Sequence, residues 1–386
     1  MNLYLSKKND SAISNKSLHI VCHDVPYPPD YGGVYDLFYK IKSLFEKGVS
    51  IHLHCFEYGR GIQPELNKYC ASVTWYKRKS FLKSLSFRLP YIVSSRADEV
   101  LLNNLLKDDF PILLEGIHCT YFLYRNELKN RKVIVRLHNV EYEYYRELAK
   151  TTKNILKKLY FTNESNLLKK YEKAIANKAL FLAVNKKDKN TYIAKFNSKN
   201  IKDLPVFLPF AEVTSEAGHG AFCLYHGNLS VPENEKAVQW LLKNIFKPVA
   251  IPFVIAGKNP SEYLNKLALQ NKNVCLVANP SQLEMDDLIK KAHVHILPSF
   301  NKTGIKIKLL NALFNGKFVV TNTAAVEGTD LHELCEIANS AEQNIKILSR
   351  LFQESFAERN IAERKKILYS IYNNDANVHQ LMQLIW

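Results

Sequence analysis

The sequence predicts an α/β protein of two doubly wound, Rossmann-like domains that face each other across a cleft. At 386 residues the chain is too long for one ordinary core, and two domains of about 150–200 residues are expected. Short apolar runs alternate with longer segments of helical periodicity, which is typical of parallel sheets covered by helices. This alternation stops near residues 204–220 and then restarts.

The first domain is expected to span residues 1–206. Its helices are predicted over 33–47, where Val34, Leu37, Phe38 and Ile41 recur at helical spacing, and around 120–130. Its strands are predicted at 18–23, 49–56, 112–117, 133–138 and 179–184.

The second domain is expected to span residues 207–369. The segment 204–220 before its first strand contains two Pro and two Gly among small polar residues, which indicates a linker. Helices are predicted at about 234–247 and 260–270, and a long helical stretch at about 341–386, of which residues 370–386 are expected to pack back on the first domain. Strands are predicted at 222–227, 253–257, 273–278, 293–298 and 317–322.

Composition narrows the class of protein. Hydrophobic residues make up 47% and charged residues 23%, as in folded soluble proteins. The seven Cys form no CxxC pair and several lie in apolar runs, which indicates buried thiols in a reducing compartment. The polar N-terminus and the lack of an apolar stretch of about 20 residues favour a cytoplasmic protein, with the inner face of the cell membrane open as a docking place.

The net charge is distributed very unevenly along the chain. The net charge is +16, and residues 1–205 carry +15 of it. A basic domain indicates a polyanionic partner, which is a nucleic acid, an anionic lipid surface or a phosphorylated substrate. We expect no metal site, because Asp108–Asp109 and Asp286–Asp287 form no DxD between strands and are interpreted as helix-surface charges.

Polar residues follow the predicted strands of the first domain. Gly32 and Gly33 stand just before a predicted helix, a place where backbone N–H groups can bind a phosphate or a sugar. A plain turn before the helix is an equally good interpretation. The spacing is not GxGxxG, so a dinucleotide site is not favoured. His118 ends the strand ILLEGIH, and its imidazole suits a sugar hydroxyl or nearby charge, although a structural His remains an alternative.

His138, Asn139 and Glu141 follow the strand VIVRLH. They suit sugar binding, and Glu141 suits a weak base, or alternatively a helix-capping or helix-surface role. In the second domain the candidates are Gly227 and Asn228 at the end of a strand, Lys258 after another, and the loop with Thr303, Gly304, Lys306 and Lys308. Cations beside a Gly loop and a helix start indicate an anion site, whereas a single Lys is as readily a surface charge.

Four segments carry a resemblance to the family 4 glycosyltransferases, members of the GT-B group: HDVPYPPDYGGVYDLFYKI (23–41), NVEYEYY (139–145), GNLSVPENEKAVQWL (227–241) and LPSFNKTGIKIKLLNALFNGKFVVTNTAAVEGTDL (297–331). The resemblance implies a GT-B fold, no cofactor, and a UDP- or GDP-linked sugar as substrate with a saccharide acceptor, transferred with retention of anomeric configuration and without a metal.

The resemblance also implies residue roles. His118 and Glu141 are expected to be catalytic. Gly32, His138 and Asn139 are expected to bind the acceptor. The donor is expected to contact Gly33, Gly227, Asn228, Lys258, Thr303, Gly304, Lys306, Lys308 and Asn311. Family members often carry two Glu at the positions of Thr303 and Asn311, and their replacement leaves a non-catalytic saccharide- or partner-binding protein as the alternative.

Two basic amphipathic segments, 75–96 and 154–178, mix Lys and Arg with large apolar residues. They fit contact with an anionic membrane, as expected for a lipid-linked acceptor, or alternatively ordinary helices packed on the sheet. Nucleic-acid binding is less favoured, because no recognised nucleic-acid-binding motif is present and the charge is spread over helices.

Overall fold

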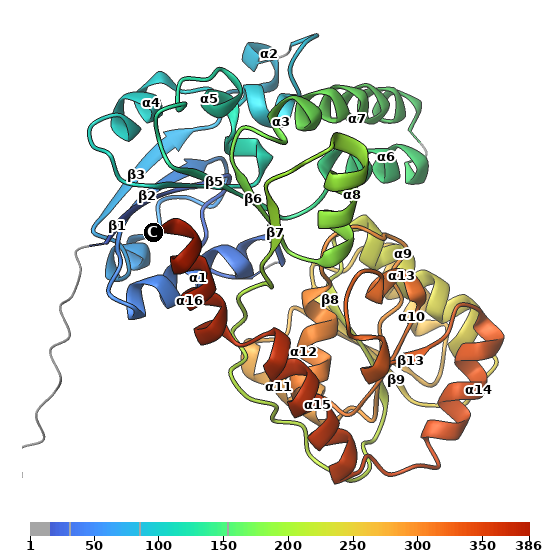
Figure 1. The fold of residues 1–386 in the computed structure, drawn as a ribbon. Helices are drawn as coiled ribbons and strands as arrows, with labels where there is room; N and C mark the ends of the chain where they lie inside the picture. The colour runs from blue at the N-terminus through green and yellow to red at the C-terminus, as the bar shows by residue number, and fades with distance from the viewer. Residues whose placement is uncertain (1–15, 31, 85, 153) are drawn as a thin grey trace, which may run out of the picture.

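The computed structural model describes residues 16–386 except 31, 85 and 153, and in these residues it contains two parallel sheets in separate lobes (Figure 1). The first sheet has the strand order β3-β2-β1-β4-β5-β6-β7 and the second the order β10-β9-β8-β11-β12-β13. All the strand pairs that build them are parallel. The expected two-domain α/β fold is therefore confirmed.

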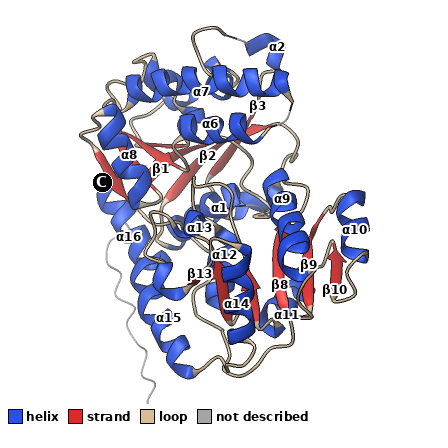
Figure 2. Ribbon diagram, turned by 90° about the vertical axis from the view of Figure 1, so that its right-hand side faces the viewer, coloured by secondary structure: helices blue, strands red, loops and turns tan. Residues whose placement is uncertain are grey.

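The N-terminal sheet has helices on both faces. Figure 2 shows α1 on one side of this sheet and α6 and α7 on the other. Side chains of β1 alternate between two cores: Leu18 and Ile20 pack with α1, and Val21 packs with α6 and α7. The strands are β1 (Ser17–Cys22), β2 (Ser50–Glu57), β3 (Ser72–Lys77), β4 (Ile112–Glu115), β5 (Val133–Leu137), β6 (Leu180–Ala183) and β7 (Ile201–Asp203). The helical elements are α1 (Gly32–Glu46), η1 (Pro64–Lys68), α2 (Phe81–Ser84), α3 (Tyr91–Ser94), α4 (Glu99–Leu105), η2 (Ile117–Cys119), α5 (Tyr121–Tyr124), α6 (Glu141–Thr151), α7 (Ile155–Ile175) and α8 (Lys186–Phe196).

The C-terminal sheet is covered in the same way. In β8, Cys223 and Tyr225 pack into the large core, while Leu224 packs on α11 at the opposite face. The strands are β8 (Cys223–Asn228), β9 (Phe253–Lys258), β10 (Val274–Ala278), β11 (Val294–Ile296), β12 (Phe318–Thr321) and β13 (Glu336–Ile337). The helical elements are α9 (Pro232–Leu241), η3 (Leu242–Phe246), α10 (Glu262–Leu269), α11 (Gln282–Lys291), α12 (Ile307–Asn315), α13 (Thr323–Val326), η4 (His332–Leu334), α14 (Ala341–Leu351), α15 (Glu358–Ile371) and α16 (Asn374–Ile385).

The last helix returns to the N-terminal lobe, where Figure 1 shows α16 beside α1. Its apolar residues Val378, Leu381 and Ile385 are fully buried with side chains of β1 and α1. The chain therefore passes between the lobes twice, once at the linker that follows β7 and once between α15 and α16.

The helical stretch expected at 341–386 is present and consists of three helices, which end at Leu351, Ile371 and Ile385. Some local expectations were wrong. The basic segment 75–96 begins inside strand β3. Asp108 is not a helix-surface charge: it lies in the turn before β4, accepts from the Phe110 N–H and pairs with His19 and Arg131. Asp286 and Asp287 do lie exposed on α11, as expected.

Candidate active site between the domains

Each sheet has one point where the strand order reverses, between β1 and β4 in the first and between β8 and β11 in the second. Ligands of doubly wound proteins bind outside the carboxyl ends of the strands at such points. The two lobes touch near these ends: a Cβ atom added to Gly304 would lie 2.4 Å from Asn139 Oδ1. Lys258 Nζ also lies 3.7 Å from Asp30 Oδ2, and Lys187 Nζ donates to the Lys302 carbonyl at 2.8 Å.

Three imidazoles meet at the N-terminal reversal. His23 follows β1, His118 lies in η2 after β4, and His138 follows β5. The His23 ring stacks on His118 with centroids 4.9 Å apart and meets His138 edge-on at 5.4 Å. Burial lowers the pKa values of His23 and His118 well below the ordinary imidazole value. Both rings are therefore neutral at pH 7 and offer one donor and one acceptor nitrogen each.

One ring nitrogen of His118 is available to bond a ligand. Its Nδ1 is buried and has no hydrogen-bond partner among the described residues. A Cβ atom on Gly116 would lie 2.8 Å from this nitrogen, and the φ of +78° at Gly116 also favours glycine. An unpaired buried nitrogen is costly unless a ligand satisfies it.

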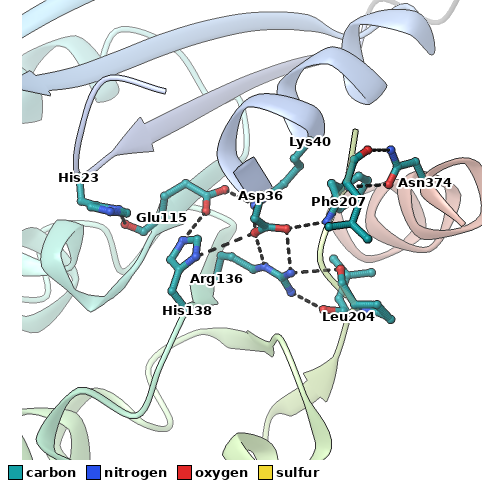
Figure 3. Close-up of polar contacts among 11 residues, drawn as sticks. His23, Asp36, Lys40, Glu115, Arg136, His138, Leu204, Phe207 and Asn374 are labelled. Atoms are coloured by element: carbon teal, nitrogen blue, oxygen red, sulfur yellow. Dashed lines mark hydrogen bonds and ion pairs between the residues drawn. The ribbon is translucent and has the colours of Figure 1, made fainter. Parts of the chain in front are cut away.

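A buried ion-pair network lies behind the imidazoles (Figure 3). Asp36 and Lys40 come from α1, Glu115 from β4 and Arg136 from β5, and all four side chains are at most 2% exposed. Lys40 Nζ lies 2.9 Å from Asp36 Oδ2 and 2.7 Å from Glu115 Oε1. Glu115 Oε2 lies 3.0 Å from His138 Nε2, which fixes the ring of His138.

This network is not built as a metal site. Asp36, Glu115 and His138 form the only set of three potential metal ligands within 4.8 Å of one another in the described residues. The Lys40 ammonium contacts both carboxylates, and the Arg136 guanidinium makes two bonds to Asp36. These cations occupy the positions from which a metal ion would bind the two carboxylates.

The segment after β5 presents Asn139 and Glu141. Asn139 Nδ2 donates to Glu141 Oε1 at 3.4 Å. Glu141 is 4% exposed, and burial raises its pKa to about 7. Its backbone N–H and that of Tyr142 donate to the carboxylate of Glu172 on α7 at 3.1 and 3.0 Å. The carboxylate of a neighbouring helix thus caps the start of α6.

The C-terminal reversal is lined by Gly and Lys residues. Gly227 has a φ of +150°, a conformation that favours glycine, and a Cβ there would lie 3.9 Å from Lys308 Cδ. Lys308 Nζ donates to Tyr225 Oη and Asn234 Oδ1, both at 2.8 Å. Burial lowers the pKa of Lys308 to about 7, with Glu233 opposing and Lys306 assisting this shift. Burial also lowers the pKa of Lys306, whose Nζ donates to the Thr303 carbonyl at 2.7 Å.

The other expected donor contacts lie around this cluster. Thr303 is buried and donates from Oγ1 to Asn301 Oδ1 at 2.8 Å. Asn228 Oδ1 accepts from Ser230. Asn311, in the middle of α12, accepts at Oδ1 from Nδ2 of Asn315, the last residue of that helix, at 2.8 Å. Lys258 is the most exposed member, at 54%.

The comparisons with known proteins agree with this architecture. Residues 221–353 match the family described as Glycosyl transferases group 1. A 44.6 kDa protein in the cps region of Klebsiella pneumoniae is 29% identical over 383 residues, 92% of this chain and 94% of the relative. The chain is a glycosyltransferase with the GT-B fold.

Solved structures show the same two-lobed fold at low sequence identity. Sucrose-phosphate synthase from Thermosynechococcus elongatus is 12% identical with a TM-score of 0.69, covering 96% of this chain and 98% of its own. TarM is 11% identical with a TM-score of 0.67 and the same coverage. Anabaena HepE, solved with UDP and glucose, is 11% identical with a TM-score of 0.64, covering 95% and 98%.

The cleft of this glycosyltransferase contains a cavity of about 310 Å³ beside the donor-side loops. Phe161, Tyr144 and Leu148 line it from α6 and α7, and Phe300 and Val231 line it from the C-terminal domain. Lys157 and Lys236 also line it, one from each domain. The cavity thus has apolar walls, and each domain adds one cation and one carboxylate, Glu147 from the first and Glu233 from the second.

The structure therefore brings His118, His138, Asn139 and Glu141 to one side of the domain contact and Gly227, Lys306 and Lys308 to the other. Gly32 and Gly33 begin α1, two and three residues after Asp30, which pairs with Lys258. Sequence reasoning missed His23, Asp36, Glu115 and Arg136. His23 ends the first predicted strand, so its position was a usable signal, whereas the other three lie inside elements chosen for their apolar pattern.

Proposed function

We propose that this glycosyltransferase transfers a sugar from a UDP- or GDP-linked donor to a saccharide acceptor. The observation that carries the proposal is the pair of half-buried lysines, Lys306 and Lys308, beside Gly227 at the strand reversal of the C-terminal domain, because the surrounding protein lowers the pKa of both. An ammonium group that is partly removed from water gains from a nearby anion, and a nucleoside diphosphate supplies one. HepE, which was solved with UDP and glucose, supports the choice of donor class.

The proposed chemistry needs no metal. Departure of a nucleoside diphosphate builds negative charge, and fixed cations with a helix N-terminus stabilise it in a site that excludes water. Lys306 and Lys308 stand at the first turn of α12 and supply both features. Retention of anomeric configuration and membership in family 4 are part of the proposal.

On the acceptor side, His118 presents its unpaired nitrogen to a sugar hydroxyl. His138 and Asn139 hold the acceptor saccharide, and Gly32 at the start of α1 approaches it. Glu141 acts as a weak base, because a pKa of about 7 suits proton transfer near neutral pH.

On the donor side, Gly33, Asn228, Thr303, Gly304 and Asn311 contact the nucleotide sugar, and exposed Lys258 neutralises part of its charge.

We further propose that the acceptor is lipid-linked and destined for a surface polysaccharide. The relative in a cps region supports this assignment. No helix in the described ranges is long and apolar enough to cross a membrane. Contact with the inner face of the membrane would then be peripheral.

An exposed surface supports this peripheral contact. The apolar patch consists of Phe81, Leu82, Phe87, Ile155, Leu156 and Leu159, of which Phe87 is 92% exposed and Leu82 89%. Its two halves meet because the Phe81 ring lies 5.8 Å from Tyr160 on α7. Basic residues stand close to these apolar residues in the sequence: Lys77, Arg78, Lys79, Arg88, Lys157 and Lys158. Lys157 also lines the 310 Å³ cleft cavity, so the patch leads to the site.

A thermal-shift screen with UDP, GDP, ADP and CMP, each with and without Mg²⁺, tests the proposal. A ligand that binds only the folded state at about 100 times its Kd stabilises it by about 2.7 kcal/mol. We expect UDP or GDP to raise the melting temperature equally in both conditions, and the Lys306→Ala, Lys308→Ala double variant to lose the shift. No shift with any nucleotide would overturn the donor assignment, and a shift that requires Mg²⁺ would overturn the metal-independent mechanism.

A further inference from the structure

The linker between the domains is bonded to the buried ion-pair network. The Phe207 N–H donates to Asp36 Oδ1 at 2.9 Å. Arg136 donates from Nη1 to the Leu204 carbonyl at 2.5 Å and from Nη2 to the Pro205 carbonyl at 3.1 Å. Asp36 and Arg136 in turn share two bonds of 3.0 and 3.1 Å. Residues 204–207 are thus held by side chains of α1 and β5 (Figure 3).

A cavity lies next to the following part of the linker, residues 208–212. Asn374 at the start of α16 bonds both the N–H and the carbonyl of Leu208, at 3.0 and 2.7 Å. Beyond it lies a cavity of about 530 Å³ between α1, residues 208–212 and the α15–α16 junction. Both passages of the chain between the lobes lie at this cavity. A few residues at such a crossing are where hinge motions of two domains are absorbed.

The same network continues from Asp36 to the cleft. Asp36 Oδ2 contacts Lys40 Nζ, Lys40 Nζ contacts Glu115 Oε1, and Glu115 Oε2 contacts His138 Nε2, at 2.9, 2.7 and 3.0 Å. Asp36 Oδ2 also lies 4.0 Å from His138 Nδ1. His138 is followed by Asn139, which meets Gly304 of the C-terminal domain. The path therefore runs from the linker to the domain contact at the candidate site.

The path is a fixed link rather than a pH switch. Burial opposes ionisation of Asp36, but Arg136 and Lys40 outweigh burial and hold the pKa of Asp36 below its ordinary value. Two carboxylates and two cations balance each other within the network, and removal of one leaves a buried charge unpaired. Each member therefore constrains the others over the neutral pH range.

We propose that Asp36 is a positioning residue that couples His138 in the cleft to the linker between the two domains. Movement of the linker as the domains close is then transmitted to the His138 imidazole through Asp36, Lys40 and Glu115. Its consequence for turnover rests on the proposed glycosyl transfer, whereas the coupling itself does not.

The test compares two variants of the full chain, Asp36→Asn and Glu115→Gln. Hydrogen exchange of the 204–208 segment reports on the linker, and the imidazole ¹⁵N resonances of His138, assigned by their loss in His138→Gln, report on the cleft. Glu115→Gln touches the His138 end alone, whereas Asp36 bonds the linker and also lies 4.0 Å from His138 Nδ1. The decisive result is therefore the effect of Glu115→Gln on the linker. We expect Glu115→Gln to raise linker exchange roughly tenfold, since a hydrogen bond to a charged group holds the linker, and Asp36→Asn to shift the His138 resonances.

Asp203→Asn is the matched control. Asp203 precedes the linker, is part-exposed and pairs with Lys189 outside the network, so this change should move neither signal. Effects confined to the near end in both variants would overturn the coupling. If Asp36→Asn does not fold, an unchanged linker in Glu115→Gln overturns it alone. With a nucleotide-sugar donor, kcat should fall in both variants while the KM for the donor stays unchanged. If the wild type shows no turnover at all, that result counts against the proposed function. The hydrogen-exchange and resonance measurements then decide the coupling.

Discussion

Lys308 is a residue whose proposed role in binding carries a cost to the stability of the fold. Its half-buried ammonium group donates to Tyr225 and Asn234, and desolvation lowers its pKa to about 7. The folded state therefore disfavours the charged form, and this cost is fully present below pH 7 and diminishes as the pH rises from 7 towards the unfolded value near 10.5. A bound diphosphate would reverse the balance and favour the charged form.

Lys308→Met should weaken binding of the nucleoside diphosphate at least about tenfold, because it removes a buried charge partner. It should not lower the melting temperature at pH 7, since Tyr225 Oη still donates to Asn234 Oδ1 at 3.1 Å and the desolvated ammonium group of Lys308 is gone. In the wild type, affinity should fall between pH 7 and pH 9, because binding must restore the proton that free Lys308 loses above about pH 7. Calorimetric titrations across that range measure both effects.

The control for this prediction is Lys266→Met, which removes an exposed lysine of α10 away from the cleft. It should leave affinity and its pH dependence unchanged. Equal affinity in the Lys308 variant and the wild type would remove Lys308 from the donor site. If the affinity of Lys308→Met falls between pH 7 and pH 9 as steeply as that of the wild type, the titrating group is not Lys308.

Sequence reasoning placed Lys306 and Lys308 on one loop but not their partners. Tyr225 lies 83 residues before Lys308, and only folding brings its hydroxyl to the ammonium group. Asp36 is a still clearer case, because it follows Val34 and precedes Leu37 in a helix predicted from its apolar spacing. Its partner Arg136 lies 100 residues away, and a pattern within one element carries no signal of such a contact.

At the scale of elements, α6 depends on its neighbour. The residue before it, Val140, offers no side-chain cap, and the first N–H groups of the helix donate instead to Glu172 of α7. Glu172 also accepts from the Tyr192 hydroxyl at 2.8 Å. Because α6 carries Glu141 at its first turn, this cap positions one wall of the cleft.

Glu172→Gln should destabilise the protein by about 1–3 kcal/mol, because one buried N–H loses its acceptor. Burial raises the pKa of Glu172 to about 8, above its unfolded value near 4.5. The folded state therefore binds more protons between these values, and the stability that Glu172 contributes falls as the pH rises from about 5 to 8. The destabilisation should accordingly be larger at pH 5.5 than at pH 8, as measured by urea unfolding.

Glu147→Gln, on the surface of α6 with Lys150 as its partner, is the matched control and should change stability little at either pH. If Glu172→Gln unfolds at the same urea concentration as the wild type, the cap contributes nothing. Faster hydrogen exchange at the start of α6 should accompany the loss of stability.

Most elements were predictable because parallel strands buried on both faces are short, nearly continuous apolar runs. Strand β1 was expected at 18–23 and lies at Ser17–Cys22. Strand β3 was not predicted, because SVTWYK runs into a basic stretch that was interpreted as an amphipathic surface. The break before α16 had a signal that was overlooked: Asn373 caps this helix by accepting from the Ala376 N–H.

At the scale of the whole molecule, the two domains could be predicted from the restart of the strand–helix alternation. Their mutual placement could not, because it rests on contacts between distant segments such as Gly304 with Asn139 and Lys186 with Asp330. The uneven charge gave a further global signal, since nearly all of the net positive charge lies in residues 1–205. The exposed apolar patch lies in this basic part of the chain, and the patch allows a test of the proposed membrane contact.

Leu156→Glu with Leu159→Glu should abolish binding to vesicles that contain anionic phospholipid. Both leucines are exposed on the first turns of α7, at 77% and 63%, and insertion of such side chains into the interface adds to the attraction of the surrounding lysines. Each basic residue near an anionic surface contributes about 1 kcal/mol, so wild-type binding should weaken steeply with salt and be weak on neutral vesicles. Co-sedimentation at two salt concentrations measures this.

A matched control separates the patch from general surface hydrophobicity. Leu269 and Leu283 are exposed at 86% and 83% on α10 and α11 of the near-neutral C-terminal domain. Leu269→Glu with Leu283→Glu adds the same two charges and removes the same two leucines, yet should leave vesicle binding close to that of the wild type. Because both double variants change the net charge equally, a loss of binding in both would assign it to total charge rather than to α7. Undiminished binding of the α7 variant would instead show that the patch does not face the membrane, and the acceptor would then have to reach the cleft from solution.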